Sequence, residues 1–264
     1  MSKSARRVAS VAAQWIFSAA VVYAVWEWLL APNLSRVFMA PPSAVWDQLT
    51  SWASNGTMFS LSYTTFSEAF VGFVIGSAAG LLFALVIGLS PYLTSKVLEP
   101  VVVAIYAMPK FVLVPILYIW LGSDFLPRVL LVTAAVFPLV AIYTLTGIRT
   151  VDPDRVTMMR LMGASRAQIA SKLLIPHTMR YVVTGLTFSF PHAVTMAIGA
   201  EILFGTTTGL GGTLYTDAQQ FNAAAVIAAL IIATALAAVL TGICRLIGTL
   251  ALASFGTPAS PART

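Results

Sequence analysis

Residues 160–179, RLMGASRAQIASKLLIPHTM, form the only long polar and basic stretch in a chain that is otherwise strongly apolar. Apolar segments at 128–148 and 181–203 lie on either side of the loop that contains it. A membrane protein that keeps one organised basic loop between two apolar spans usually presents it to a cytoplasmic partner. Four of the chain's 15 lysines and arginines lie in this stretch or directly after it: Arg160, Arg166, Lys172 and Arg180.

The composition indicates a membrane protein. Hydrophobic residues make up 59% of the chain and charged residues only 9%, whereas soluble domains carry about 25% charged residues. The formal net charge of +6 fits the excess of lysine and arginine found in cytoplasmic loops. No basic face interleaved with stacking aromatic residues is present, so we expect no nucleic-acid partner. The predicted fold class is an all-α, polytopic membrane helix bundle.

Six segments are long enough to cross a membrane as helices, since the hydrocarbon core requires about 20 apolar residues. They divide the chain into an N-terminal anchor helix with an outer interfacial segment (1–62), a core of spans (63–252) that holds a cytoplasmic loop at about 149–180, and a cytoplasmic tail (253–264). The six expected spans are 9–31, 64–89, 98–121, 128–148, 181–203 and 223–250.

The distribution of basic residues orients these spans. If the N-terminus is cytoplasmic, Arg36 and Arg128 lie on the outer side, and Lys110 lies within a span and is not counted. This asymmetry predicts that both termini are cytoplasmic. Twelve basic residues then lie inside: Lys3, Arg6, Arg7, Lys96, Arg149, Arg155, Arg160, Arg166, Lys172, Arg180, Arg245 and Arg263.

The first half of the basic loop predicts a short helix. Asp152 is a favourable N-cap, and Pro153 suits the first helical position. The helix can continue to about Met162, where Gly163 fits the left-handed C′ position that ends many helices.

The second half of the loop predicts another short helix. Ser165 and Gln168 have the spacing of a capping box. Pro176 is expected to end this helix near Leu174, because the residue before a proline disfavours α geometry. A helix of two or three turns needs a surface on which to lie. The residues alone leave open whether that surface is a partner protein or the lipid headgroups.

Small residues recur at every fourth position on two spans. Such stripes allow helix backbones to approach closely in lipid, either at a sliding or dimer interface or in static packing within one bundle. The first stripe is Gly72, Gly76, Gly80, Ala84 and Gly88, and the second is Gly185, Ser189, Ala193 and Ala197, with Glu201 next on the same face.

Lys110 is the notable ionisable residue within a span. A lysine near the bilayer centre costs about 2.5–3.5 kcal/mol on insertion scales, so it should face protein or water. Pro109 interrupts the local helix, which is tolerated where the backbone lines a cavity. Lys110 is expected either to line a translocation pathway or to snorkel or pair with Glu201 or Glu99.

The remaining ionisable residues do not suggest an enzyme. His192 follows a proline in a span, and a lone histidine there is more often packed than a ligand. No carboxylate or cysteine stands near it at metal-ligand spacing, so we expect no metal site. Glu27 and Glu68 lie at span ends and are expected at the headgroups. No nucleophile–base pair is recognisable, so no catalytic residue is predicted.

The basic loop resembles the EAA loop of inner-membrane permeases of binding-protein-dependent ABC importers. That pattern is roughly E-A-A-x₃-G-x₉-I-x-L-P. Here Gly163 stands at the glycine, Leu173-Leu174-Ile175-Pro176 forms the downstream part, and the spacing from glycine to proline is kept. Thr157-Met158-Met159 stands where Glu-Ala-Ala is usual, which puts the acidic contact of the family in doubt.

Two further segments are similar to the nitrate, sulfonate, taurine and thiamine-precursor subgroup of these permeases. Residues 101–122 follow its P-x₅-P-x₄-W-[FL]-G pattern through Pro109, Pro115, Trp120 and Gly122. Residues 200–201 and 209–211 match its A-E…G-L-G segment through Ala200-Glu201 and Gly209-Leu210-Gly211.

The resemblance implies a type I ABC importer permease fold and a multi-pass subunit of the bacterial inner membrane. The helix after Gly163 would then be the coupling helix. Two copies of a separate ABC ATPase would bind ATP-Mg, since the chain itself has no G-x-x-x-x-G-K-[ST] motif. The other implied partners are a second copy of this permease, an extracytoplasmic substrate-binding protein and the lipid bilayer. The expected ATPase-coupling residues are Gly163, Ala164, Ser165, Arg166, Gln168, Ile169, Leu173 and Pro176.

The expected substrate is a small anion such as a sulfonate, nitrate or an organic acid. The alternative function is that of a secondary transporter or channel that is not coupled to ATP. The expected residues of the translocation pathway are Pro109, Lys110, His192 and Glu201.

Overall fold

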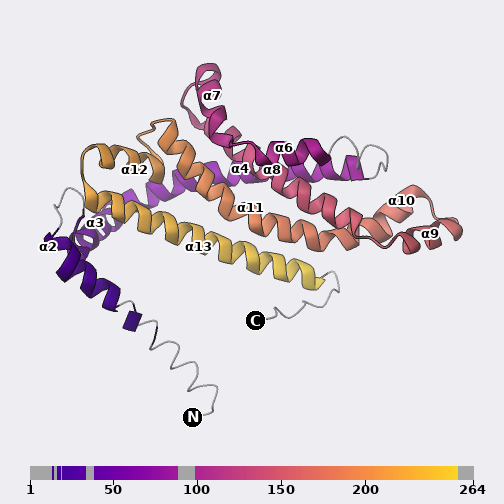
Figure 1. Ribbon diagram of the computed structural model, residues 1–264, viewed down its shortest axis with the longest axis horizontal. Coiled ribbons are helices and arrows are strands. Elements are labelled where there is room, and N and C mark those ends of the chain that lie inside the picture. The colour runs from indigo at the N-terminus through magenta and orange to yellow at the C-terminus, as the bar shows by residue number, and fades with distance from the viewer. Residues whose placement is uncertain (1–13, 15–16, 19, 34–38, 89–98, 255–264) are drawn as a thin grey trace, which may run out of the picture.

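The computed structural model describes residues 14, 17–18, 20–33, 39–88 and 99–254, and no strand occurs among them. Four of their helices are long and apolar enough to cross a membrane: α4 (Thr57–Gly88), α8 (Phe125–Arg149), α11 (Ile175–Leu203) and α13 (Ala223–Ser254). These helices run side by side along the molecule (Figure 1). The predicted all-α membrane bundle is therefore confirmed.

A fifth candidate span is broken. Helices α6 (Glu99–Ala107) and α7 (Val114–Leu121) are joined by the 3₁₀ turn η3 (Lys110–Leu113). The two halves are bent by 82°, and Figure 1 shows α7 turned away from the direction of the long helices. The expected interruption at Pro109 is thus present, and it is much sharper than a kink.

Three of the segment boundaries expected from the sequence can be compared with the structure only in part or lie elsewhere. The expected span 9–31 lies partly outside them, although its described end is helical through the π-helical segment η1 (Val25–Leu30) and α2 (Ala31–Asn33). In the expected tail, 255–264 also lies outside the described residues. The division expected after residue 62 falls inside α4.

The small-residue stripes pack helices of this one chain against each other. A Cβ atom on Gly72 would lie 2.6 Å from the Val132 Cβ on α8, and one on Gly80 would lie 2.6 Å from the Phe137 carbonyl oxygen. On α11, a Cβ atom on Gly185 would lie 2.8 Å from the Tyr143 Cβ. These glycines therefore permit close backbone approach within the bundle.

Helices α3 (Pro42–Ser54) and α12 (Gly209–Gln219) cover one end of α13. Trp52 of α3 and Leu210 of α12 are buried in the same apolar cluster with alanines of α13. In Figure 1, both short helices lie at the opposite end of the molecule from the basic loop.

The basic loop contains α9 (Pro153–Leu161), α10 (Arg166–Ile169) and the π-helical segment η4 (Ala170–Leu174). The prediction that Pro176 ends a helix is wrong. Segments α10, η4 and α11 form one continuous helix of 38 residues from Arg166 to Leu203. Proline lacks an N–H and clashes with the carbonyl four residues earlier. The wider π-helical turn directly before Pro176 accommodates both effects.

Candidate coupling and translocation sites

Arg149 and Arg180 stand where the apolar stretches of α8 and α11 end on the side of the basic loop. The ends of α8 and α11 lie side by side there, since Thr150 Oγ1 is 3.3 Å from His177 Nε2. A Cβ atom on Gly147 would also lie 2.9 Å from the Tyr181 Cβ. Two cations at one level, each next to a long apolar span, are typical of the cytoplasmic interface.

The turn at Gly163 is built as the sequence predicts. The Asp152 side chain accepts a hydrogen bond of 2.9 Å from the Asp154 N–H at the start of α9. Gly163 has φ +80°. The Gly163 N–H donates to the Arg160 carbonyl and the Ala164 N–H to the Met159 carbonyl, each at 3.0 Å. This pair of bonds is the Schellman motif.

The capping box at the start of α10 is also confirmed. The Ser165 N–H donates to Gln168 Oε1 at 2.8 Å, and the Gln168 N–H donates to Ser165 Oγ at 3.3 Å. Arg166 and Pro176 are exposed, while Ala164 and Leu173 are half-buried. Ile169 is only 5% exposed, and it lines a cavity of about 890 Å³ on the loop together with Val156, Ala164 and Leu174.

Three apolar side chains on the loop are exposed instead. Met158 is 61% exposed, and Leu161 and Met162 are each 83% exposed. Residues three and four apart share one face of a helix, so this sequence spacing is the signal that could have identified them. We call these three residues the apolar tip.

Lys110 lies at the bend between α6 and α7. Pro109, with φ −64° and ψ 106°, precedes η3. The Lys110 ammonium donates to the Tyr106 carbonyl and lies 5.2 Å from the centroid of the Tyr106 ring. Its contacts within the described residues thus come from the end of α6, and no ion pair with Glu201 is formed.

His192 is brought close enough to Lys110 for an electrostatic interaction. The neighbouring Phe111 ring packs on Gly199, where an added Cβ would lie 2.9 Å from it. At about 1.5 Å per residue along α11, His192 and Gly199 lie roughly 18 and 28 Å from the level of Arg180. On this scale His192 lies near the middle of a hydrocarbon core about 30 Å thick, and Gly199 lies near the surface remote from the basic loop.

Glu201 belongs to a separate buried cluster. Its Oε1 accepts a hydrogen bond of 2.7 Å from Thr65 Oγ1, and its Oε2 accepts one of 2.5 Å from the Gly211 N–H. The Leu210 N–H donates to Thr65 Oγ1 at 2.9 Å. Glu201 is fully buried, and it stabilises the N-terminus of α12, where backbone N–H groups otherwise lack partners.

Glu68 lies in the same cluster, which corrects its expected place at the headgroups. It is fully buried, and its Oε1 lies 3.0 Å from Arg128 Nε. Arg128 is only 7% exposed and interacts with both carboxylates. Arg128 and Glu68 thus form an ion pair that joins α8 to α4 inside the protein. Each charge needs the other, because burying either one alone would carry a large desolvation cost.

Replacing Arg128 by methionine should destabilise the fold by about 3–5 kcal/mol, since removal of one partner leaves Glu68 buried and uncompensated. The measurement is the thermal unfolding of the purified variant in neutral detergent. Arg155→Met is the matched control, because Arg155 pairs with Asp152 at 3.9 Å with both side chains exposed. The control should cost at most about 1 kcal/mol. Equal losses in both variants would contradict a structural role for the pair.

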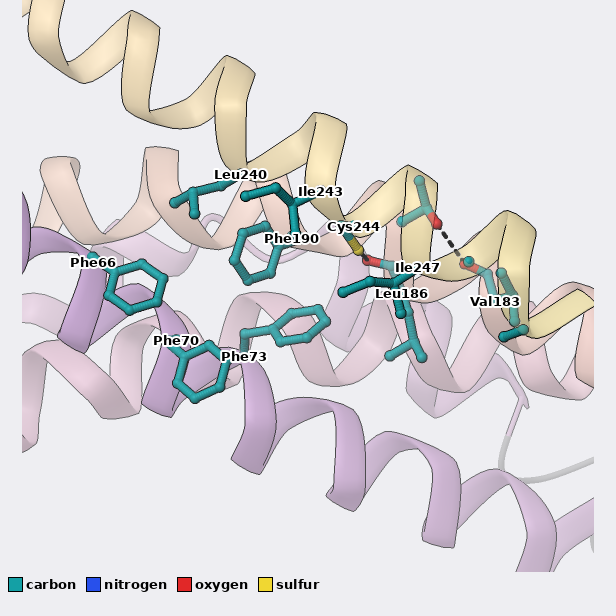
Figure 2. A pocket seen from close by; sticks show the side chains of 13 residues that line it. Phe66, Phe70, Phe73, Val183, Leu186, Phe190, Leu240, Ile243, Cys244 and Ile247 are labelled. Carbon is teal, nitrogen blue, oxygen red and sulfur yellow. Dashed lines mark hydrogen bonds between the residues drawn. The ribbon is translucent and has the colours of Figure 1, made fainter.

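An apolar cavity with a volume of about 430 Å³ lies between α4, α11 and α13. Figure 2 shows Phe66, Phe70 and Phe73 on one side of it and Ile243 and Ile247 on the other. An anion would lose its hydration in such a cavity without gaining a partner. The cavity is therefore unsuited to a polar substrate, in contrast to the surroundings of Lys110.

Comparisons with known proteins agree with this architecture. The family described as "Binding-protein-dependent transport system inner membrane component" matches residues 76–252. The taurine transport system permease protein TauC of Escherichia coli (strain K12) is 28% identical over 216 residues, which cover 80% of this chain and 78% of that protein. The putative aliphatic sulfonates transport permease protein SsuC of Bacillus subtilis (strain 168) is 26% identical over 204 residues, which cover 77% of this chain and 73% of that protein.

Solved structures support the fold in the same way. A chain of a bacterial ABC transporter involved in the import of the acidic polysaccharide alginate aligns with a TM-score of 0.64 at 14% identity. The alignment covers 92% of this chain and 98% of that chain. At this identity the likeness concerns the fold alone, which is that of type I ABC importer permeases.

Proposed function

This chain belongs to the family of binding-protein-dependent transport system inner membrane components, and we propose that it forms the translocation pathway of an ATP-driven importer of small anions. It is a transport permease subunit of an ABC importer and not an enzyme. The observation that carries the proposal is a basic loop, capped at both of its short helices, that extends from the ends of two long apolar helices.

A separate ABC ATPase docks on this loop and drives the permease. Two ATPase subunits hold ATP-Mg, because this chain contains no phosphate-binding P-loop sequence. A second copy of the permease completes the pathway, and an extracytoplasmic binding protein delivers the substrate. Closure of the two ATPase subunits on ATP moves the loops of the two permeases together and opens the pathway outward.

The substrate is a small anion. The relatives TauC and SsuC are named for taurine and for aliphatic sulfonates, and both of these compounds carry a sulfonate group. In this chain, Lys110 and His192 supply neighbouring cationic or hydrogen-bonding groups at the broken span. A substrate anion passing them would offset the cost of a lysine within the membrane.

Co-purification tests this function. The chain is purified from the membranes of its host through an affinity tag in neutral detergent, and ATP hydrolysis is measured in the eluate. An ATPase subunit at one copy per permease, with activity, is expected. If the pure chain retains no ATPase under conditions that keep it folded and transports its substrate without ATP, the function is that of a secondary transporter or channel.

We propose that both termini and the basic loop lie in the cytoplasm, as the distribution of basic residues predicts. Single cysteines at Thr57 and at Ser165, each in a Cys244→Ser background, test this orientation with an impermeant thiol reagent. Thr57 begins α4 at the end remote from the loop, so its cysteine should be labelled in intact cells. The cysteine at Ser165 should be labelled only after the membrane is opened. The reverse pattern would invert the topology and contradict coupling through this loop.

A further inference from the structure

The apolar cavity between α4, α11 and α13 offers no hydrogen bond to an occupant. Two of its lining side chains carry polar atoms, Thr187 and Cys244, and both are engaged within the chain. Thr187 Oγ1 donates to the Val183 carbonyl at 2.8 Å, and Cys244 Sγ donates to the Leu186 carbonyl at 3.9 Å. The other lining side chains are hydrocarbon (Figure 2). An occupant must therefore itself be hydrocarbon where it enters the cavity.

The cavity is open to the surroundings of the bundle. Phe70 is 45% exposed, and Ile243 and Ile247 are 49% and 61% exposed, so side chains that face outward form its rim. Apolar cavities in proteins exclude water and bind apolar molecules instead. In a membrane, the hydrocarbon at hand is the acyl chains of the surrounding lipids, which are as apolar as leucine.

The cavity has the length of one membrane leaflet and lies on the side of the basic loop. Its lining on α13 runs from Leu240 to Ala251, which is about 16 Å along a helix, and half of the hydrocarbon core is about 15 Å. A Cβ atom on Gly248 would lie 2.8 Å from the Val183 Cγ1, and Val183 is three residues after Arg180. The cavity therefore fits an acyl chain that extends from headgroups on the loop side.

Two arginines lie beside the lining of this cavity. Arg180 precedes the lining residue Val183 by one helical turn of α11, and Arg245 directly follows the lining residue Cys244 on α13. Both arginines are exposed, and within the described residues neither forms an ion pair with a carboxylate. The sequence of α13 contains no acidic residue. The two cations thus lack a protein anion in the described part of the chain.

Arg245 needs an anionic partner the more of the two. Its neighbour Cys244 lies at the level of Leu186, which is about 9 Å beyond Arg180 along α11. An arginine at that depth is costly unless its guanidinium group reaches the headgroup level or meets an anion. A lipid phosphate near Arg180 satisfies both conditions, because guanidinium groups match the geometry of phosphate oxygens.

A second copy of this chain fits the same face less well. A twofold contact brings the same patch of both copies together. It would therefore set one hollow against another and bring the arginines of the two copies close to each other, and like charges across an interface are unfavourable. A lipid with an acyl chain and an anionic headgroup complements both the hollow and the charge.

We infer that this cavity binds one acyl chain of an anionic phospholipid, whose headgroup phosphate is held by Arg180 and Arg245. The acyl chain fills the space between α4, α11 and α13 and supplies the dispersion contacts that an empty cavity would lack. The bound lipid thereby stabilises the packing of α13 on the bundle. The site is separate from the broken span at Lys110, so it does not depend on which substrate the permease carries.

Thermal unfolding tests the headgroup contact. The full chain, with the subunits that co-purify, is unfolded in neutral detergent at several concentrations of phosphatidylglycerol or of phosphatidylcholine with the same acyl chains. Phosphatidylglycerol should raise the unfolding temperature more, since a ligand that binds only the folded state stabilises it. Arg180→Gln and Arg245→Gln should each weaken the apparent affinity for phosphatidylglycerol by about tenfold, the effect of losing a charge-assisted hydrogen bond. Arg155→Gln, in the exposed part of the loop, is the matched control and should bind as the wild type does.

A photoreactive group in the middle of one acyl chain of phosphatidylglycerol tests the cavity itself. Cross-links should concentrate on the peptides that contain Phe70 and Ile247. Cys244→Phe places a ring in the cavity and should reduce both this cross-link and the rise in unfolding temperature. Gly242→Phe adds the same ring to α13 where a Cβ atom would meet nothing within 4 Å, and it should leave both unchanged.

Three results would overturn the inference. The first is equal stabilisation by phosphatidylglycerol and phosphatidylcholine. The second is cross-linking spread evenly over the apolar helices and unchanged in Cys244→Phe, which would show ordinary lipid contact only. The third is a disulfide between the Cys244 residues of two chains in native membranes, which would place a second copy on this face. None of these measurements uses ATP or substrate, so their outcome and that of the proposed importer function are independent.

Discussion

Replacing Gly163 by proline should abolish stimulation of ATP hydrolysis by the liganded binding protein while leaving the membrane domain folded. Gly163 has φ +80°, whereas proline fixes φ near −65° and removes the N–H that bonds to the Arg160 carbonyl. The turn must then change direction, and α10 is displaced relative to α9. A loss of at least about tenfold is expected, which corresponds to a coupling free energy of about 1.4 kcal/mol. The measurement is ATPase activity of the complex in liposomes.

The matched control is Gly163→Asn. Asparagine tolerates the left-handed conformation better than most residues, and no atom lies within 4 Å of a Cβ added to Gly163. This variant should retain most of the stimulation. Normal stimulation in Gly163→Pro would show that the loop does not couple the subunits. A loss in both variants would mean that the glycine is needed for something other than its backbone conformation.

Replacing Lys110 by methionine should lower the rate of anion transport about tenfold or more and change the apparent affinity little. An anion 4 Å from a lysine gains about 4 kcal/mol at an effective dielectric constant of 20, part of which is lost to desolvation. Affinity should reside mainly in the external binding protein. The measurement is the initial rate of ATP-driven uptake at several substrate concentrations.

Lys110→Arg keeps the positive charge and should retain part of the rate. Transport by Lys110→Met at the wild-type rate would mean that Lys110 is structural and bound only to Tyr106. Delivery of exclusively neutral or cationic ligands by the partner binding protein would contradict the assignment of an anionic substrate.

Local rules predicted the loop well, because its turns are determined by neighbouring residues. The left-handed Gly163 and the reciprocal bonds of Ser165 and Gln168 follow from short-range backbone geometry. Pro176 was misjudged because a proline tolerated by a widened turn cannot be told from a helix-ending proline by its neighbours alone. In the structure, the π-helical segment η4 precedes Pro176, and the helix continues through this proline.

Long-range pairing limited the rest of the prediction. Glu68 lies far from Arg128 in the sequence, and only the packing of α4 on α8 reveals that the two are buried together. The glycine stripe predicted a close helix contact but not its partner, which is α8 of the same chain. Ile169 was expected at a docking groove, and its burial means that Ile169→Asp would disrupt the permease itself. The sequence spacing of Met158, Leu161 and Met162 puts them on one face of α9, and their exposure in the structure shows that this face is the outward one.

Uptake into proteoliposomes tests the central claim most directly. The complex purified through this chain is reconstituted with its binding protein, and uptake of labelled taurine, an alkanesulfonate and nitrate is measured with ATP, with a non-hydrolysable ATP analogue, and with ionophores that collapse ion gradients. We predict that at least one of these anions accumulates only with hydrolysable ATP and that ionophores have no effect. Accumulation that proceeds without ATP and is abolished by ionophores would contradict the assignment of this chain to an ATP-driven importer.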